Sequence, residues 1–221
     1  MSGASVVWAV VWRDLRVELR GRELLPALAQ FIVLALVISN FAFDLGSGPN
    51  LNDVGAGILW LVLVFAGVVA FTRAFAGERD HGALDAMLLT PATAAAILTG
   101  KALASAAFLA ACELVLLPAA AVFLGLELRP EIFLIVLLAI VGMASLGSLF
   151  SAMAARTRAR ELLLPVLALP LWIPFVVVGS GLVQEAFSRT GIQLTPLLLL
   201  CYMDILFLMI AAVVARFVLD D

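Results

Sequence analysis

Residues 132–155 read IFLIVLLAIVGMASLGSLFSAMAA, twenty-four residues without a charged side chain. About 20 apolar residues are enough for a helix to cross a bilayer. Five further runs of the same character lie before and after this one, and the predicted spans are 24–43, 56–76, 102–124, 132–155, 162–178 and 194–215. We therefore expect an all-α integral membrane protein with six transmembrane helices, forming one domain over residues 1–221.

The composition supports this class. Of the 221 residues, 65% are hydrophobic and 13% are charged, whereas a soluble domain is roughly 45–50% apolar and about 25% charged. This excess of apolar residues excludes a soluble enzyme and a nucleic-acid-binding protein. Cys112 and Cys201 both lie inside apolar runs, so no disulfide framework is expected.

The basic residues predict the orientation. The chain has thirteen lysines and arginines, and only Arg129 and Arg189 follow the third and fifth spans. The other eleven fall on the opposite side, namely Arg13, Arg16, Arg20, Arg22, Arg73, Arg79, Lys101, Arg156, Arg158, Arg160 and Arg216. Because basic residues gather on the cytoplasmic side, both termini are predicted to be cytoplasmic (N-in/C-in), with no cleavable signal peptide.

Residues 5–23 have a different pattern. Apolar side chains recur at helical spacing, with three arginines on a neighbouring face; the apolar set is Trp8, Val11, Trp12, Leu15 and Leu19. This pattern predicts an amphipathic helix lying in the cytoplasmic interface of the membrane. The helix either serves only as an anchor or also binds a cytoplasmic partner.

No catalytic residue is predicted. His81 is the only histidine, so one chain cannot build a histidine-based metal site. Thr99-Gly100-Lys101 resembles the end of a phosphate-binding loop, but it lacks the earlier glycine and the hydroxyl residue after the lysine. We expect no metal, and no hydrolysis of ATP by this chain alone.

Glu113 and Asp204 are acids inside predicted spans. Acids at this depth usually face the bundle interior or water, and burial favours their protonated form. Each is either a polar point on a substrate or proton path or a structural acid. Glu113 lies shortly before Pro118, so we expect it to satisfy the backbone loosened there, and we favour a functional role for Asp204.

Small residues and glycines give two further expectations. Small residues every four positions predict close helix packing, either within the chain or in a homodimer; these are Ala144, Ser148 and Ala152, and Gly147, Ser151 and Ala155. Three prolines, Pro165, Pro170 and Pro174, should bend the fifth span. The Gly- and Ser-containing stretch 179–193 is expected to be an extracytoplasmic loop that partly dips back toward the bilayer.

The connection at 77–101 reads GERDHGALDAMLLTPATAAAILTGK. Ala83, Leu84, Met87 and Leu88 share one face of a short helix that Thr90-Pro91 would end. Connections between packed helices usually need only about 2–8 residues. The longer, amphipathic segment 77–100 therefore predicts a surface helix that contacts a partner.

This segment resembles the signature that follows the second span of ABC-2-type exporter permeases. The matching residues are Glu78, Gly82, Leu84, Asp85, Leu88, Thr90, Pro91, Gly100 and Lys101, with Ala83 in place of the usual threonine. The resemblance implies an ABC-2-type permease fold and a coupling helix seated in a cleft of an ATPase subunit. With Met87 added from the apolar face, the predicted coupling residues are Glu78, Gly82, Leu84, Asp85, Met87, Leu88 and Pro91.

The whole chain more narrowly resembles the haem exporter protein B family of bacterial cytochrome c maturation. The matching stretches are RDLRVELRGRELL from Arg13, GILWLVLVFAGVVAF from Gly57 followed by Arg73, and RARELLLPVLALPLWIP from Arg158, which includes Arg160 and Glu161 of a cytoplasmic loop. The resemblance implies an inner-membrane permease subunit of a split ABC transporter, expected to be a homodimer. Its partners would be an ATPase subunit, a haem-handling membrane subunit and a small single-span subunit.

In that assembly haem is handled by the complex and ATP is bound by the partner, with no cofactor bound by this chain alone. Three alternatives stay open. The chain could serve another ABC-2-type exporter, or act as an assembly subunit that transports nothing. It could also be an ion-coupled secondary transporter using Glu113 and Asp204, although its halves show no convincing inverted repeat.

Overall fold

The computed structural model describes residues 3–21, 24–43, 51–74, 93–155, 160–188 and 191–219. Every regular element within these ranges is a helix. The helices are α1 (Gly3–Gly21), α2 (Leu24–Phe43), α3 (Leu51–Ala74), α6 (Ala94–Leu124), α7 (Pro130–Ala155), α8 (Arg160–Ser188) and α9 (Leu194–Leu219).

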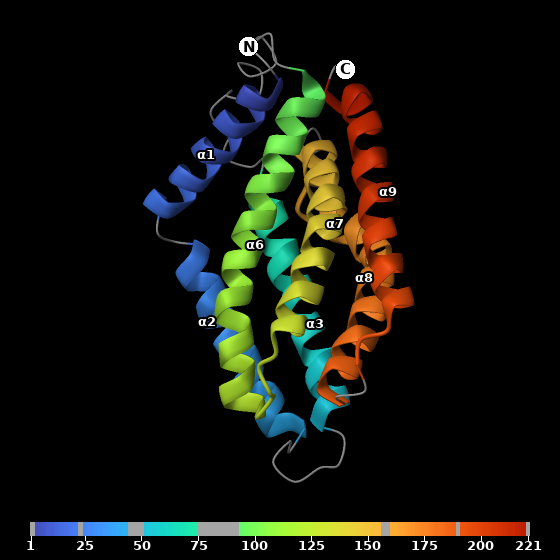
Figure 1. Cartoon of the computed structure of the whole chain (residues 1–221). Helices are drawn as coiled ribbons and strands as arrows, with labels where there is room; N and C mark the ends of the chain where they lie inside the picture. Colours follow the sequence, from blue (N-terminus) through green and yellow to red (C-terminus); the bar gives the residue numbers. More distant parts are fainter. Residues whose placement is uncertain are drawn as a thin grey trace.

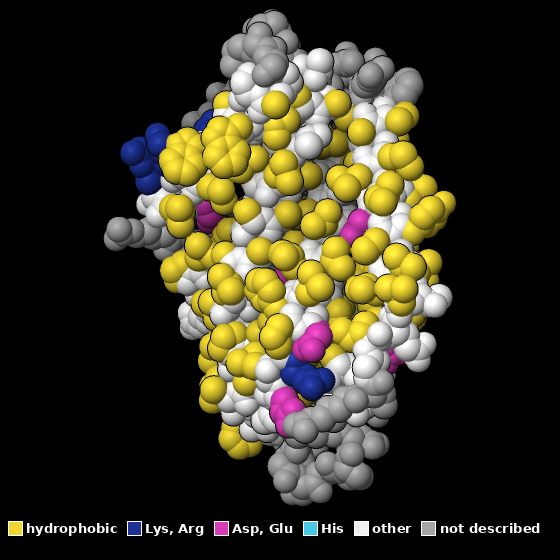
Figure 2. Space-filling view, viewed as in Figure 1, with side chains coloured by type: hydrophobic (Ala, Val, Ile, Leu, Met, Phe, Trp, Pro, Cys, Tyr) yellow, Lys and Arg dark blue, Asp and Glu magenta, His cyan; other side chains and the backbone are white. Residues whose placement is uncertain are grey.

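Six of the described helices, α2, α3 and α6 to α9, are long and apolar enough to cross a membrane. They correspond one by one to the six predicted spans, so the prediction of an all-helical, multi-pass membrane protein is confirmed. Figure 2 shows the consequence on one face of the molecule, where hydrophobic side chains dominate the surface and charged ones are few.

Helix α7 runs through the middle of the bundle, between α6 and α9 (Figure 1). In its most apolar stretch 72% of the residues are buried, compared with 17% in α2 and in α9. Helices α3, α6, α8 and α9 all pack against α7. The run at 132–155 is thus the centre of the fold, and α2 and α9, which are similarly apolar, form its edges.

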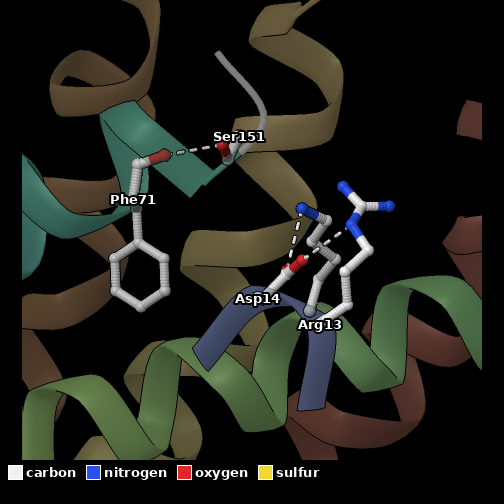
Figure 3. A network of polar contacts seen from close by, with 5 residues as sticks. Arg13, Asp14, Phe71 and Ser151 are labelled. Carbon is white, nitrogen blue, oxygen red and sulfur yellow. Dashed lines mark hydrogen bonds and ion pairs between the residues drawn. The ribbon is translucent and has the colours of Figure 1, made fainter. Parts of the chain in front are cut away.

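Glycines allow the aromatic rings of neighbouring helices to pack against α7 and α8. A Cβ atom at Gly147 would overlap the ring of Phe71 in α3, and one at Gly179 in α8 would overlap the indole of Trp60. The neighbouring Ser151 hydroxyl donates to the carbonyl oxygen of Phe71 at 2.6 Å (Figure 3). We call these three contacts, Gly147 with Phe71, Gly179 with Trp60 and Ser151 with Phe71, the central contact.

The small residues of α7 are used within the chain. Ala144, Gly147, Ser148, Ser151 and Ala152 are all buried in the single chain. Of the two expected uses of this stripe, packing inside the chain is therefore the one observed.

Two helices, α8 and α6, exceed their predicted lengths the most. Helix α8 continues to Ser188, through a stretch predicted to be a loop from Gly179, because Gly179 supplies space for the Trp60 ring and not a turn. The expected loop is thereby shortened to the few residues before α9. Helix α6 begins at Ala94, ahead of the predicted start at residue 102, because the Thr93 hydroxyl caps it by accepting from the Ala96 amide at 3.3 Å.

The start of α1, the start of α6 and the end of α9 lie at the same end of the bundle (Figure 1). This arrangement is the one that a topology with both termini on one side requires. Which side of the membrane this end faces stays a prediction.

Candidate coupling end and intramembrane acids

The predicted coupling residues Glu78, Gly82, Leu84, Asp85, Met87, Leu88 and Pro91 lie outside the described residues, as does Arg158. Arg160 and Glu161 belong to the first turn of α8, and their side chains are not described. The structure does describe the elements on either side of the coupling segment. Helix α3 ends at Ala74 before it, and α6 begins at Ala94, so residues 94–100 of the predicted segment form the first turns of α6.

The first turns of α6 are held by α1. A Cβ atom at Gly100 would come within 2.7 Å of the Val10 Cβ atom, so the two helices approach closely only because residue 100 has no side chain. One residue further on, the Lys101 ammonium lies 2.9 Å from a carboxylate oxygen of Asp14. Figure 3 shows Asp14 between this contact and a longer one, 3.7 Å, to the Arg13 side chain.

Helix α1 is present where a helix was expected. Val10 and Val11 are buried, whereas Trp8, Trp12 and Leu19 of the predicted apolar stripe are exposed on the bundle surface. The Arg16 guanidinium lies 5.1 Å from the centre of the Trp12 ring, within range of a cation–π interaction. Trp8, Trp12 and Leu19 are thus free to meet lipid, and the position of α1 in the membrane interface stays a prediction.

Glu113 is completely buried in α6. Within the described part of the chain, neither of its carboxyl oxygens has a hydrogen-bond partner. The expectation that Glu113 satisfies the backbone near Pro118 is therefore wrong. The carboxyl group instead lies among helices with its hydrogen-bonding capacity unused, an arrangement that costs free energy wherever no water enters.

Asp204 is buried at a different place, where α9 meets α7 and α8. A Cβ atom at Gly142 would overlap both an Asp204 carboxyl oxygen and the Phe175 ring, so glycine is what admits the acid. That oxygen, Oδ1, has no hydrogen-bond partner among the described residues. The centres of the Phe175 and Phe207 rings lie 5.5 Å apart, and these rings form part of the hydrophobic surroundings of Asp204.

The opposite end of the bundle is held by polar contacts around the end of α8. Arg129, in the connection between α6 and α7, donates to the carbonyl oxygen of Ala186 at 2.6 Å. The backbone N–H of Gln193 donates to a Glu185 carboxylate oxygen at 3.0 Å. Leu182, Val183, Ala186 and Phe187 share one face of α8 here, and all four are buried.

An apolar cleft of about 400 Å³ lies between α3 and α8. Leu61 and Phe65 of α3 and Leu169 and Ile173 of α8 line it. The cleft contains no charged side chain, so it is suited to apolar groups. Over the described residues no group of three or more histidine, cysteine or acidic side chains is arranged to hold a metal ion.

Six apolar helices, with α7 at their centre, define the class, a multi-pass α-helical membrane protein. More narrowly, the chain belongs to the CcmB protein family, whose sequence profile matches residues 5–219. The chain is 32% identical over 196 residues to the "Heme exporter protein B" of Rhodobacter capsulatus, covering 87% of this chain and 88% of that protein. It is 30% identical to the protein of the same name from Pseudomonas aeruginosa, covering 71% and 72%.

Proposed function

We propose that this chain is the permease subunit of a split ABC transporter that handles haem for cytochrome c biogenesis in the bacterial inner membrane. The observation that carries the proposal is the family match over residues 5–219, together with the relatives that bear the name "Heme exporter protein B". The six apolar helices agree with a permease role.

In this proposal a separate ATPase subunit binds and hydrolyses ATP, and the segment 77–100 transmits the motion. Leu84, Met87 and Leu88 form the apolar face that enters the ATPase, because an apolar helix face on a cytoplasmic loop is stable only when it is covered. The output is export of haem or release of a haem-loaded chaperone. A haem-handling membrane subunit, a single-span subunit and a second copy of this chain complete the assembly.

The coupling role is tested by placing charge on that apolar face. We expect Leu84→Asp combined with Leu88→Asp to abolish co-purification of the ATPase subunit, because two carboxylates would have to be desolvated in the docking cleft. Ala92→Asp is the matched control, since it adds a carboxylate to the same loop beyond Pro91. Undiminished co-purification with the double variant, at normal levels in the membrane, would show that this face is not the docking site.

The two buried acids favour one alternative, an ion-coupled secondary transporter in which Glu113 and Asp204 carry protons. The energy source separates the two functions. The proposed permease loses cytochrome c maturation when the ATPase subunit is made unable to hydrolyse ATP. A secondary transporter keeps working with that inactive subunit and stops when a protonophore collapses the proton gradient.

A further inference from the structure

We infer that α1 and the first turns of α6 move as one unit, and that Asp14 and Lys101 are positioning residues for the coupling segment. We call the meeting of Val10, Asp14, Gly100 and Lys101 the α1–α6 contact. The inference deepens the proposed function, because it gives the N-terminal helix a part in transmitting motion from an ATPase to the membrane helices.

The charge pair is the first observation. The Lys101 side chain is only 3% exposed, and the Asp14 side chain is 18% exposed. A buried lysine needs a close carboxylate, because its ammonium group has lost most of its water. The ammonium and carboxylate are 2.9 Å apart, so this ion pair joins the start of α6 to α1 (Figure 3).

The steric fit is the second observation, and it is independent of charge. Adjacent residues of α6, Gly100 and Lys101, meet positions 10 and 14 of α1. Positions four apart lie on the same face of a helix. A glycine that admits Val10 and a lysine that binds Asp14 therefore fix both the distance between the helices and their register.

The place of this contact along the chain gives it a role. Lys101 directly follows the segment 77–100 and lies eight residues after the capping residue Thr93, roughly two helical turns into α6. A force applied to that segment is passed directly to the two helices that flank it, α3 and α6. Helix α6 cannot slide past α1 without separating Lys101 from Asp14, so α1 must follow.

Arg13 provides a matched control within the same site. Its Nε atom lies 3.7 Å from the other oxygen of Asp14, and its side chain is 42% exposed. Exposed ion pairs contribute little, whereas a buried charge that loses its partner is strongly unfavourable. Lys101→Gln and Arg13→Gln each remove one positive charge from Asp14, but only the first removes the buried one.

The functional test uses the complete transporter complex purified from its host. We expect Lys101→Gln and Asp14→Asn to keep the amount of ATPase that co-purifies within twofold, and to lower cytochrome c maturation per assembled complex at least fivefold. Arg13→Gln should mature cytochrome c normally, and the exchange Asp14→Lys with Lys101→Asp should restore part of the loss. Equal behaviour of Lys101→Gln and Arg13→Gln would overturn the inference, as would a loss fully explained by less protein in the membrane.

A distance measurement tests the contact without any ATPase. Spin labels are placed at Val17 and Leu103, which are exposed on α1 and α6, after Cys112→Ala and Cys201→Ala remove the two native thiols. We expect one narrow distance distribution in this background and with Arg13→Gln, and a broader or shifted one with Lys101→Gln or with the uncharged Lys101→Met. An unchanged distribution in both lysine variants would show that the ion pair does not hold α1. If no ATPase co-purifies even with the native chain, the proposed function fails, while this measurement still decides the α1–α6 contact.

Discussion

The central contact and the α1–α6 contact bring helices together in different ways. Both depend on a glycine that admits a neighbouring side chain, Phe71 at Gly147 and Val10 at Gly100. The central contact then adds fully buried rings and one hydroxyl bond, whereas the α1–α6 contact adds an ion pair at the edge of the bundle. The first cannot be opened without creating cavities in the core. The second depends partly on one ion pair, so the loss of a single charge weakens it without opening the core.

The largest expected effect comes from filling the central contact. A side chain at Gly179 would overlap the fully buried Trp60 indole, so we expect Gly179→Ala to lower the free energy of unfolding by roughly 3 kcal/mol, the upper range for overpacking. Gly181→Ala, two residues along the same helix, meets open space and should be neutral or stabilising. Thermal unfolding of the purified proteins in detergent measures both. Similar unfolding temperatures for the two variants would contradict the close approach of α3 and α8.

The contrast also shows what could be predicted from the sequence. The six spans follow from runs of apolar residues, because in a bilayer length and polarity alone nearly determine where a helix crosses. These features depend on residues that are close together in the sequence.

Other features depend on residues that meet only in the folded chain. The stretch that begins at Gly179 has the composition of a loop. Only the Trp60 ring opposite Gly179 explains why a helix continues there. The pairing of Asp14 with Lys101 was missed because Asp14 lies among arginines, any of which is a nearer partner in sequence. One signal was present: two acids four residues apart, Asp14 and Glu18, share one face of α1, and a glycine directly precedes a lysine in α6.

The two intramembrane acids, Glu113 and Asp204, differ from both contacts because each has at least one carboxyl oxygen without a hydrogen-bond partner among the described residues. Asp204 packs against α7 and α8 next to the central contact, whereas Glu113 has no hydrogen bond to lose. We therefore expect Glu113→Gln to support cytochrome c maturation normally. Asp204→Asn should assemble normally and lose maturation activity, because the amide fits beside Gly142 and cannot ionise. Native levels of holocytochrome c in the Asp204→Asn strain would show that its carboxylate need not ionise.

The smallest expected effect comes from the one hydroxyl bond of the central contact. Ser151→Ala removes the donor to the Phe71 carbonyl oxygen, and hydrogen bonds between membrane helices contribute about 0.6 kcal/mol on average. Ser145→Ala is the matched control, because this serine is also buried in α7 but donates to Val141 of its own helix at 2.8 Å. A bond within one helix persists when the helices separate in the membrane, so its loss should leave the unfolding equilibrium unchanged. Titration of both variants with a denaturing detergent should shift only the Ser151→Ala transition, and an equal shift in both would mean that the hydroxyl does not join α3 to α7.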